Sequence, residues 1–201
     1  MVDYGAGNAS SVERALARLG AATVRAAGPE PLAAVQAIVL PGVGHFATLA
    51  AALDARGLRQ PLLDAIAGGV PFLGICLGLQ ALWAGSDEAP AACGLGLLEG
   101  RVAALPAAVK LPHMGWNRME RRGAAASRLL AGVPGDAYVY FAHSFAGPPA
   151  DAVAVCSYGS TFAAVVERRN VFGVQFHPEK SGAVGAAVLG NFLAAAGEGA
   201  P

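Results

Sequence analysis

The sequence has few of the residues that mark a secreted, membrane or nucleic-acid-binding protein. Its 201 residues include three cysteines, Cys76, Cys93 and Cys156, with no C-x-x-C spacing. This usage predicts neither a disulfide framework nor a metal site, and it favours a reducing cytoplasm. Fourteen basic and fourteen acidic residues leave no net charge. That balance argues against nucleic acid or an acidic membrane surface as a partner.

Charge is scarce as well as balanced, because charged residues make up 14% of the chain. Residues 65–86 carry none, over a length that could cross a bilayer. The segment nevertheless contains Pro71, Gln80 and five glycines, which break it into a strand, a turn and a helix. The start of the chain has no secretion signal. We therefore expect no membrane segment.

The apolar pattern changes character along the chain. Helical stripes at residues 12–19 and 46–53 alternate with strands near Val24, at 38–40 and at 72–75, and Ser10–Glu13 offers a capping box. Short strands follow at 95–98, 102–105, 138–141, 152–156, 162–166 and 171–176, before a last helix through 184–192. This order predicts one α/β domain over residues 1–201, with a mostly parallel central sheet flanked by helices and an antiparallel extension.

The most informative segment is Gly74-Ile75-Cys76-Leu77-Gly78. It has the form of a nucleophile elbow, a tight turn between a strand and a helix, with sulfur in place of the serine oxygen. The glycines let the chain fold back around a strained apex residue. The start of the following helix favours a thiolate at Cys76. Taken alone, the pattern fits a nucleophile and a core cysteine about equally.

A cysteine nucleophile needs a base and a group that orients the base. Of the four histidines, His177 follows directly on the apolar strand 171–176 and is followed by Pro178 and Glu179. In an extended chain the side chains of His177 and Glu179 project to one side, so the carboxylate can accept the imidazole N–H. A solvated turn is the alternative interpretation. H-x-E also opens the zinc deaminase signature, but the required P-C-x-x-C is absent from the sequence.

The third element is Pro41-Gly42-Val43-Gly44, which follows the apolar strand 38–40. Such a loop can aim a backbone N–H at a neighbouring site. The amides of Val43 and Leu77 are therefore candidates for an oxyanion hole. An ordinary strand-to-helix turn is the alternative. Because the loop is rich in glycine, we expect the Val43 amide to be misdirected in the chain alone.

Together, these three motifs resemble the class I (triad) glutamine amidotransferases. Four further segments resemble one branch of that family, the glutaminase subunits of imidazole glycerol phosphate synthases in histidine biosynthesis. They are residues 3–8, 110–117 and 140–144, and the Lys180-Ser181 pair after the glutamate. The resemblance covers essentially the whole chain and implies a flavodoxin-like α/β fold. Only Met1 and Val2 precede the first motif, so we expect a clipped first strand or a start farther upstream.

The resemblance implies a role for each matching residue. Cys76, His177 and Glu179 would form the catalytic triad, with Val43 and Leu77 as the oxyanion hole. Glutamine would be held by Gly42, Gly44, Gln80, His143, Ser144 and Phe145, the last of which stands where a tyrosine is common. Asn8, Trp116, Asn117 and Lys180 would face a separate partner, a (β/α)8-barrel cyclase that receives ammonia in a heterodimer. No cofactor or metal is implied.

Three alternatives stay open. One is another glutaminase of this class, such as that of pyridoxal phosphate synthesis, against which the segment 110–117 argues. The second is a cysteine hydrolase or stress protein on a similar sheet, which would lack Gln80 and the His-Pro-Glu pairing. The third is a catalytically dead regulatory module, against which the intact Cys76, His177 and Glu179 argue. For Cys93, Cys156, His45 and His113 we expect structural roles.

Overall fold

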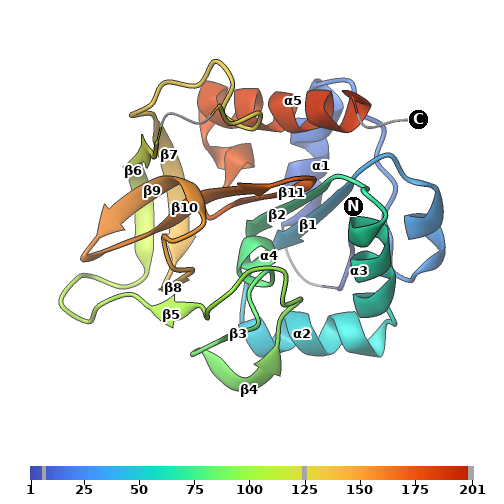
Figure 1. Cartoon of the computed structure of the whole chain (residues 1–201), viewed down its shortest axis with the longest axis horizontal. Helices are drawn as coiled ribbons and strands as arrows, with labels where there is room; N and C mark the ends of the chain where they lie inside the picture. Colours follow the sequence, from blue (N-terminus) through green and yellow to red (C-terminus); the bar gives the residue numbers. More distant parts are fainter. Residues whose placement is uncertain (6–7, 124–125, 199–201) are drawn as a thin grey trace.

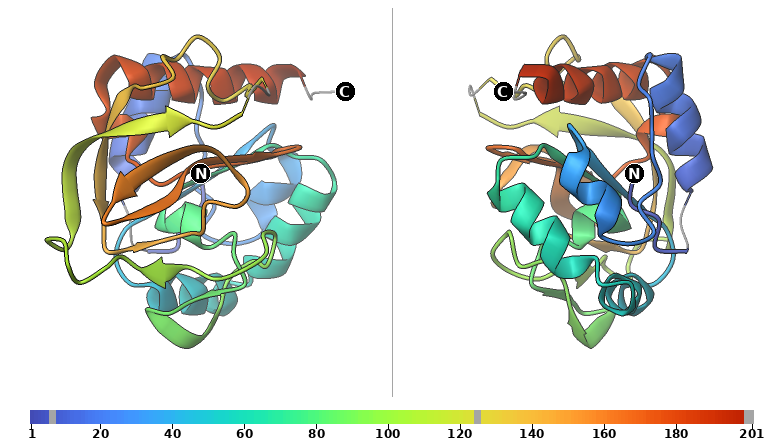
Figure 2. Two further views of the ribbon diagram at one scale, coloured as in Figure 1. Left: turned by 60° about the vertical axis from the view of Figure 1, so that its left-hand side comes forward. Right: turned by 90° about the vertical axis from the view of Figure 1, so that its right-hand side faces the viewer.

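The structure, a computed structural model, describes residues 1–5, 8–123 and 126–198 (Figure 1). A twisted sheet runs through the middle of the molecule, with helices on both sides (Figures 1 and 2). Its strand order is β1-β2-β11-β10-β9-β6-β7. Two small sheets pair β3 with β4 and β5 with β8. Residues 6 and 7 of the first motif lie outside the described residues.

The strands of the large sheet are β1 (Ile38–Gly42), β2 (Phe72–Cys76), β11 (Val171–Val174), β10 (Ser160–Arg168), β9 (Ala152–Tyr158), β6 (His113–Arg121) and β7 (Tyr138–His143). The short strands are β3 (Gly85–Ser86), β4 (Ala89–Cys93), β5 (Ala103–Ala104) and β8 (Phe145–Ala146). The α-helices are α1 (Ala9–Arg18), α2 (Phe46–Ala55), α3 (Arg59–Ala67), α4 (Leu77–Gln80) and α5 (Gly182–Glu198). Two 3-10 turns span Glu30–Ala34 and Pro178–Lys180.

The predicted class, one α/β domain with an antiparallel extension, agrees with this arrangement. The extension is large. Within the described residues, β1–β2 and β2–β11 pair in parallel, and the four other pairings of the large sheet are antiparallel. The parallel part is thus confined to three strands. Strand alternation splits the core in two, because successive side chains of a strand face opposite sides. Leu73 and Ile75 pack with α1 and α5, whereas Phe72 packs with α2 and α3.

Several local predictions were wrong. Val24 does not begin a strand: it is 59% exposed, and Ala26 makes a single bridge to Val2. The capping box is absent, because α1 begins at Ala9 after Asn8 and has no side-chain cap. The sequence reading also missed α3 and β6. Among the described residues, no helix is long and apolar enough to cross a membrane.

The register of the parallel strands builds the candidate site. Gly42 lies opposite Cys76 where β1 and β2 end. β11 pairs with the other side of β2 and ends shortly before His177. The carboxyl ends of parallel strands meet at one edge of the sheet, where α/β proteins place their chemistry. The three motifs, far apart in sequence, therefore converge on one edge.

Candidate active site

Cys76 sits at a strained turn between β2 and α4. Its φ of 53° and ψ of −107° are rare for a residue with a side chain. The flanking glycines make the turn possible: a Cβ on Gly74 would lie 2.5 Å from the carbonyl oxygen of Gly78, and one on Gly78 would lie 1.9 Å from that of Leu40. The helix α4 has only four residues. A helix this short has a weaker dipole than the helix that we predicted from the sequence.

His177 and Glu179 form a buried pair. The Nδ1 atom of His177 lies 2.9 Å from Oε1 of Glu179, and their side chains are 3% and 1% exposed. The pair arises from a 3-10 turn at Pro178–Lys180, not from the extended chain that the sequence suggested. The amide of Asn8 also donates to Oε1, at 3.1 Å. Asn8, which we predict to face a partner, thus also supports the carboxylate.

The electrostatics of His177 favour its charged form. Burial lowers the pKa of the imidazole, but hydrogen bonds to Cys76 and Glu179 outweigh that effect and raise the pKa to about 9. Burial also raises the pKa of Glu179, and the hydrogen bond and charge of His177 reverse this and hold the pKa below its ordinary value. The site is thus built to hold a carboxylate and an imidazolium beside the Cys76 sulfur.

The Pro-Gly-x-Gly loop lies against the elbow. A Cβ on Gly42 would lie 2.6 Å from the backbone nitrogen of Gly78, so Gly42 serves close packing. Gly44 has a φ of +99°, which favours glycine. The N–H of Val43 donates to the hydroxyl of Tyr4 at 3.3 Å, and that hydroxyl lies 3.4 Å from the carbonyl oxygen of Val43. The Val43 amide is therefore already engaged.

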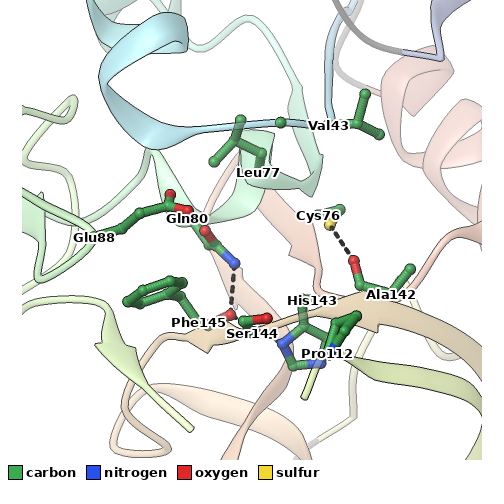
Figure 3. A pocket seen from close by; sticks show the side chains of 11 residues that line it. Val43, Cys76, Leu77, Gln80, Glu88, Pro112, Ala142, His143, Ser144 and Phe145 are labelled. Atoms are coloured by element: carbon green, nitrogen blue, oxygen red, sulfur yellow. Dashed lines mark hydrogen bonds between the residues drawn. The ribbon is translucent and has the colours of Figure 1, made fainter.

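A pocket of about 220 Å³ opens beside Cys76 (Figure 3). It brings together eight residues assigned from the sequence: Val43, Gly44, Cys76, Leu77, Gln80, His143, Ser144 and Phe145. Glu88, Pro112 and Ala142 also line it. Gly42, His177 and Glu179 are not among the lining residues.

Two polar residues of the site were not predicted from the sequence. Glu88 lines the pocket, and its Oε2 atom accepts from the backbone N–H of Phe46 at 2.8 Å, at the start of α2. Gln175 is fully buried and lies between Gln80 and Cys76. Nothing in the local sequence marked Glu88. Gln175 had a signal, since an amide inside the apolar strand 171–176 needs a buried polar partner.

A chain of hydrogen bonds runs from the outside of β6 to the pocket wall. Nδ1 of His143 lies 2.9 Å from the carbonyl oxygen of Phe145, and Nε2 of His143 lies 3.1 Å from Nδ1 of His113. The amide nitrogen of Asn117 lies 3.2 Å from Nε2 of His113. A carbonyl only accepts, so His143 carries its proton on Nδ1 and His113 donates to it. Both rings are therefore neutral.

Burial agrees with this assignment. It lowers the pKa of His113 to about 4 and is the main cause that lowers the pKa of His143 to about 3. A second proton on either ring would place two N–H donors opposite each other. The structural role that we expected for His113 is therefore to hold His143 in one tautomer. His45 accepts from the backbone N–H of Ala47 and so caps α2.

The outer face of β6 and β7 is apolar and exposed. Met114, Trp116 and Tyr138 are 64%, 56% and 59% exposed. Trp116 packs edge-on against Tyr140, and the Nζ atom of Lys180 lies 5.6 Å from the centre of the Tyr140 ring. Trp116 and Lys180 thus meet on one surface, which we call the β6–β7 face. Asn117 is half-buried beside it.

The two remaining cysteines lie away from this chemistry. Burial raises the pKa of the Cys156 thiol to about 12, so it stays protonated. Cys93 is exposed at the end of β4 and is absent from the pocket lining. In the part of the chain that the structure describes, no group of three or more His, Cys, Asp or Glu side chains could hold a metal ion.

The chain is similar in sequence to one known family and to named proteins. The family described as "Glutamine amidotransferase class-I" matches residues 1–196. The imidazole glycerol phosphate synthase subunit HisH of Desulfitobacterium hafniense (strain Y51) is 48% identical over 195 residues, covering 96% of this chain and 92% of that protein. The subunit of the same name from Deinococcus radiodurans is 46% identical over 197 residues and covers 96% and 91%.

Solved structures share the fold at low sequence identity. A structure described as a glutamine amidotransferase superposes with a TM-score of 0.76 at 21% identity, covering 98% of this chain and 97% of that one. PurLQS from Thermotoga maritima gives a TM-score of 0.76 at 22% identity, with 96% of each chain covered. These likenesses confirm the predicted fold class.

Proposed function

The chain belongs to the family of class I glutamine amidotransferases, and from this premise we propose that it is the glutaminase subunit of an imidazole glycerol phosphate synthase. It hydrolyses glutamine and passes the ammonia to a separate (β/α)8 cyclase subunit of a cytoplasmic heterodimer in histidine biosynthesis. The observation that carries the proposal is the strained elbow cysteine, which opens into a pocket on the same edge of the sheet as the buried His177–Glu179 pair. The names of the relatives supply the pathway.

The first half of the reaction forms a thioester. The Cys76 thiolate attacks the side-chain amide carbon of glutamine, and the carbonyl oxygen becomes an oxyanion. His177 gives its proton to the leaving nitrogen, so the C–N bond breaks and ammonia departs. The raised pKa of His177 supports this role, because the imidazolium holds the required proton at neutral pH. Glu179 stabilises that imidazolium and fixes its orientation.

The second half releases glutamate. Neutral His177 takes a proton from water, the hydroxide oxygen attacks the thioester carbon, and the C–S bond breaks. The Cys76 thiolate and the His177 imidazolium are thereby restored. No external oxidant, reductant or metal enters the balance. Leu77, directly after the nucleophile, supplies one backbone donor to the oxyanion, and Val43 supplies the second once it leaves Tyr4.

The pocket offers the groups that a glutamine molecule needs. Glu88 is the one carboxylate among the lining residues, so it is the natural partner for the α-ammonium group of the substrate. Gln80 and residues 142–145 also line the pocket (Figure 3), and in this proposal they hold the chain of the substrate toward Cys76. Because Glu88 also binds the start of α2, its carboxylate is already oriented before substrate arrives.

The β6–β7 face is the proposed docking surface for the cyclase. It places exposed aromatic and apolar side chains around Trp116, with Lys180 at its edge, and such residues are enriched in protein interfaces. Lys180 follows Glu179 directly in the chain, so a partner seated on this face reaches the triad region.

The test is a glutamate-release assay on three samples: the chain alone, its complex with a (β/α)8 cyclase, and that complex with the cyclase ligand bound. We expect slow hydrolysis by the chain alone and a rate about 10²–10³ higher in the ligand-loaded complex, the value of one correctly aimed oxyanion donor. Equal rates in all three samples would contradict partner gating and favour a free-standing amidase.

A further inference from the structure

Gln175 is a fully buried amide that touches the candidate nucleophile. It follows β11 and its backbone N–H donates to the carbonyl oxygen of Ala164 at 2.9 Å. Its side-chain nitrogen Nε2 lies 3.6 Å from Sγ of Cys76. A buried amide is retained only when its donors and acceptors are used. The question is therefore which end of the amide faces the sulfur.

A backbone carbonyl determines the orientation of the Gln175 amide. The carbonyl oxygen of Phe145 can only accept, and it lies 2.7 Å from the side-chain amide of Gln80. The Gln80 group that faces it is therefore the NH₂ group. The same NH₂ group lies 3.2 Å from the side-chain amide of Gln175, so Gln175 turns its oxygen toward Gln80. Its own NH₂ group is left facing Cys76.

The carbonyl oxygen of Phe145 is itself held in place. His143, locked in one tautomer by His113, donates to the same Phe145 oxygen. Two donors thus fix one acceptor on the pocket wall. The orientation of Gln175 follows from a network and not from the freedom of a single side chain, and the network reaches Asn117 on the inner side of β6.

We propose that Gln175 stabilises the Cys76 thiolate by donating a hydrogen bond to its sulfur, and that Gln80 positions Gln175 for this task. The inference rests on Cys76 as the nucleophile of the proposed function. The amide acts together with the His177 imidazolium, which lies beside the same sulfur, and it takes over the role that the helix dipole would otherwise have, because α4 is a single turn. Hydrogen bonds to a charged acceptor are stronger than those to a neutral one, so the contact favours thiolate over thiol.

The test is the pH dependence of alkylation of Cys76 by iodoacetamide, followed by peptide mass spectrometry on the full chain without glutamine. Gln175→Met keeps the volume and removes the donor, and Gln175→Glu replaces the donor by a negative charge. We expect the pH midpoint of Cys76 alkylation to rise by about one unit in the first variant and by more in the second. Gln60→Glu makes the same charge change on an exposed amide and is expected to leave the midpoint unchanged.

Two cysteines serve as internal references. Cys93 is exposed and reports reagent activity, whereas Cys156 is buried and becomes reactive only if the core opens. If Gln175→Met exposes Cys156, Gln80→Leu replaces it, and we expect a smaller upward shift of the same sign. An unchanged Cys76 midpoint in a variant that keeps Cys156 protected overturns the proposal. Alkylation needs neither glutamine nor a partner, so failure of the glutaminase assay is a separate outcome.

Discussion

The backbone N–H of Val43, a candidate oxyanion donor, hydrogen-bonds to the hydroxyl of Tyr4 at 3.3 Å. Tyr4 is 3% exposed, and burial raises the pKa of its phenol, so the hydroxyl stays neutral and able to accept. While this bond exists, the amide cannot serve the oxyanion. We therefore predict that the Tyr4–Val43 contact restrains glutamine hydrolysis by the chain alone.

Removal of the Tyr4 hydroxyl is expected to raise the basal activity. Tyr4→Phe keeps the buried ring but leaves the Val43 amide without this acceptor. A net hydrogen bond of about 1 kcal/mol corresponds to a roughly fivefold rise in glutamate release by the chain alone. Tyr138→Phe, at an exposed tyrosine, is the matched control. A folded Tyr4→Phe variant with unchanged or lower basal activity would argue against the contact as a restraint.

The nucleophile can be identified by three parallel substitutions. Cys76→Ala is expected to abolish glutamine hydrolysis, because loss of a covalent nucleophile costs about 10⁶ in turnover. Cys93→Ala and Cys156→Ala are expected to stay close to wild type. The glutamine-derived electrophile diazo-oxo-norleucine should label Cys76 alone. Label on Cys93 or Cys156, with Cys76 unmodified, would refute the assignment.

The base and its orienter are separated by a pH profile. His177→Ala is expected to be nearly inactive, whereas Glu179→Gln keeps measurable activity because Glu179 only supports the imidazole. In the wild type, activity should fall as pH rises through about 9, where His177 loses the proton that ammonia needs. In Glu179→Gln the loss of the carboxylate charge lowers the pKa of His177. The alkaline limb of the pH profile, where activity falls, therefore moves to lower pH.

The matched control for that profile is Glu120→Gln, the same change at an exposed carboxylate that pairs with Arg118. It is expected to leave the alkaline limb in place. A Glu179→Gln limb that coincides with wild type would show that the carboxylate does not set the pKa of His177. Full activity of His177→Ala would remove the triad altogether.

The buried histidines predict acid sensitivity of the fold. His113 and His143 have pKa values lowered to about 4 and about 3, below the ordinary value of about 6.5. The unfolded chain therefore binds more protons between these limits, and stability falls as pH drops below about 6.5. The slope is about 1.4 kcal/mol per pH unit for each ring.

Urea unfolding between pH 7 and pH 5 measures that slope. His113→Gln combined with His143→Gln should flatten it, even if the variant is less stable at pH 7. The matched control, His45→Gln, changes the histidine that caps α2 and should keep the wild-type slope. An unchanged slope in the double variant would show that these rings are not the groups that titrate.

The sequence predicted the parts of the site that depend on local geometry. The strained elbow at Cys76 and the His177–Glu179 pair each lie within a few residues, and glycine or proline marks both turns. The contacts that it missed join distant segments. Tyr4 meets Val43, and Gln175 meets Cys76, only after β1, β2 and β11 pair. Glu88 reaches the pocket from a hairpin with no apolar pattern strong enough to predict it.

The errors have a similar cause. Ser10–Glu13 fitted a capping pattern, but Asn8 is held by Glu179, which sets the start of α1 at Ala9. Asn8 and Asn117, which we predict to face a partner, also hydrogen-bond inside the chain, to Glu179 and His113. The sequence does not distinguish an amide side chain that is free at the surface from one that is bonded inside the chain, because the fold determines which groups lie near it.

During turnover, Cys76 is expected to carry the glutamyl group as a thioester. The direct measurement is peptide mass spectrometry of the chain–cyclase complex, quenched in acid while it turns over isotopically labelled glutamine. We expect one labelled glutamyl thioester per chain, on the peptide that contains Cys76, and none in Cys76→Ala. Label on Cys93 or Cys156 instead, or glutamate release by Cys76→Ala at the wild-type rate, would contradict it.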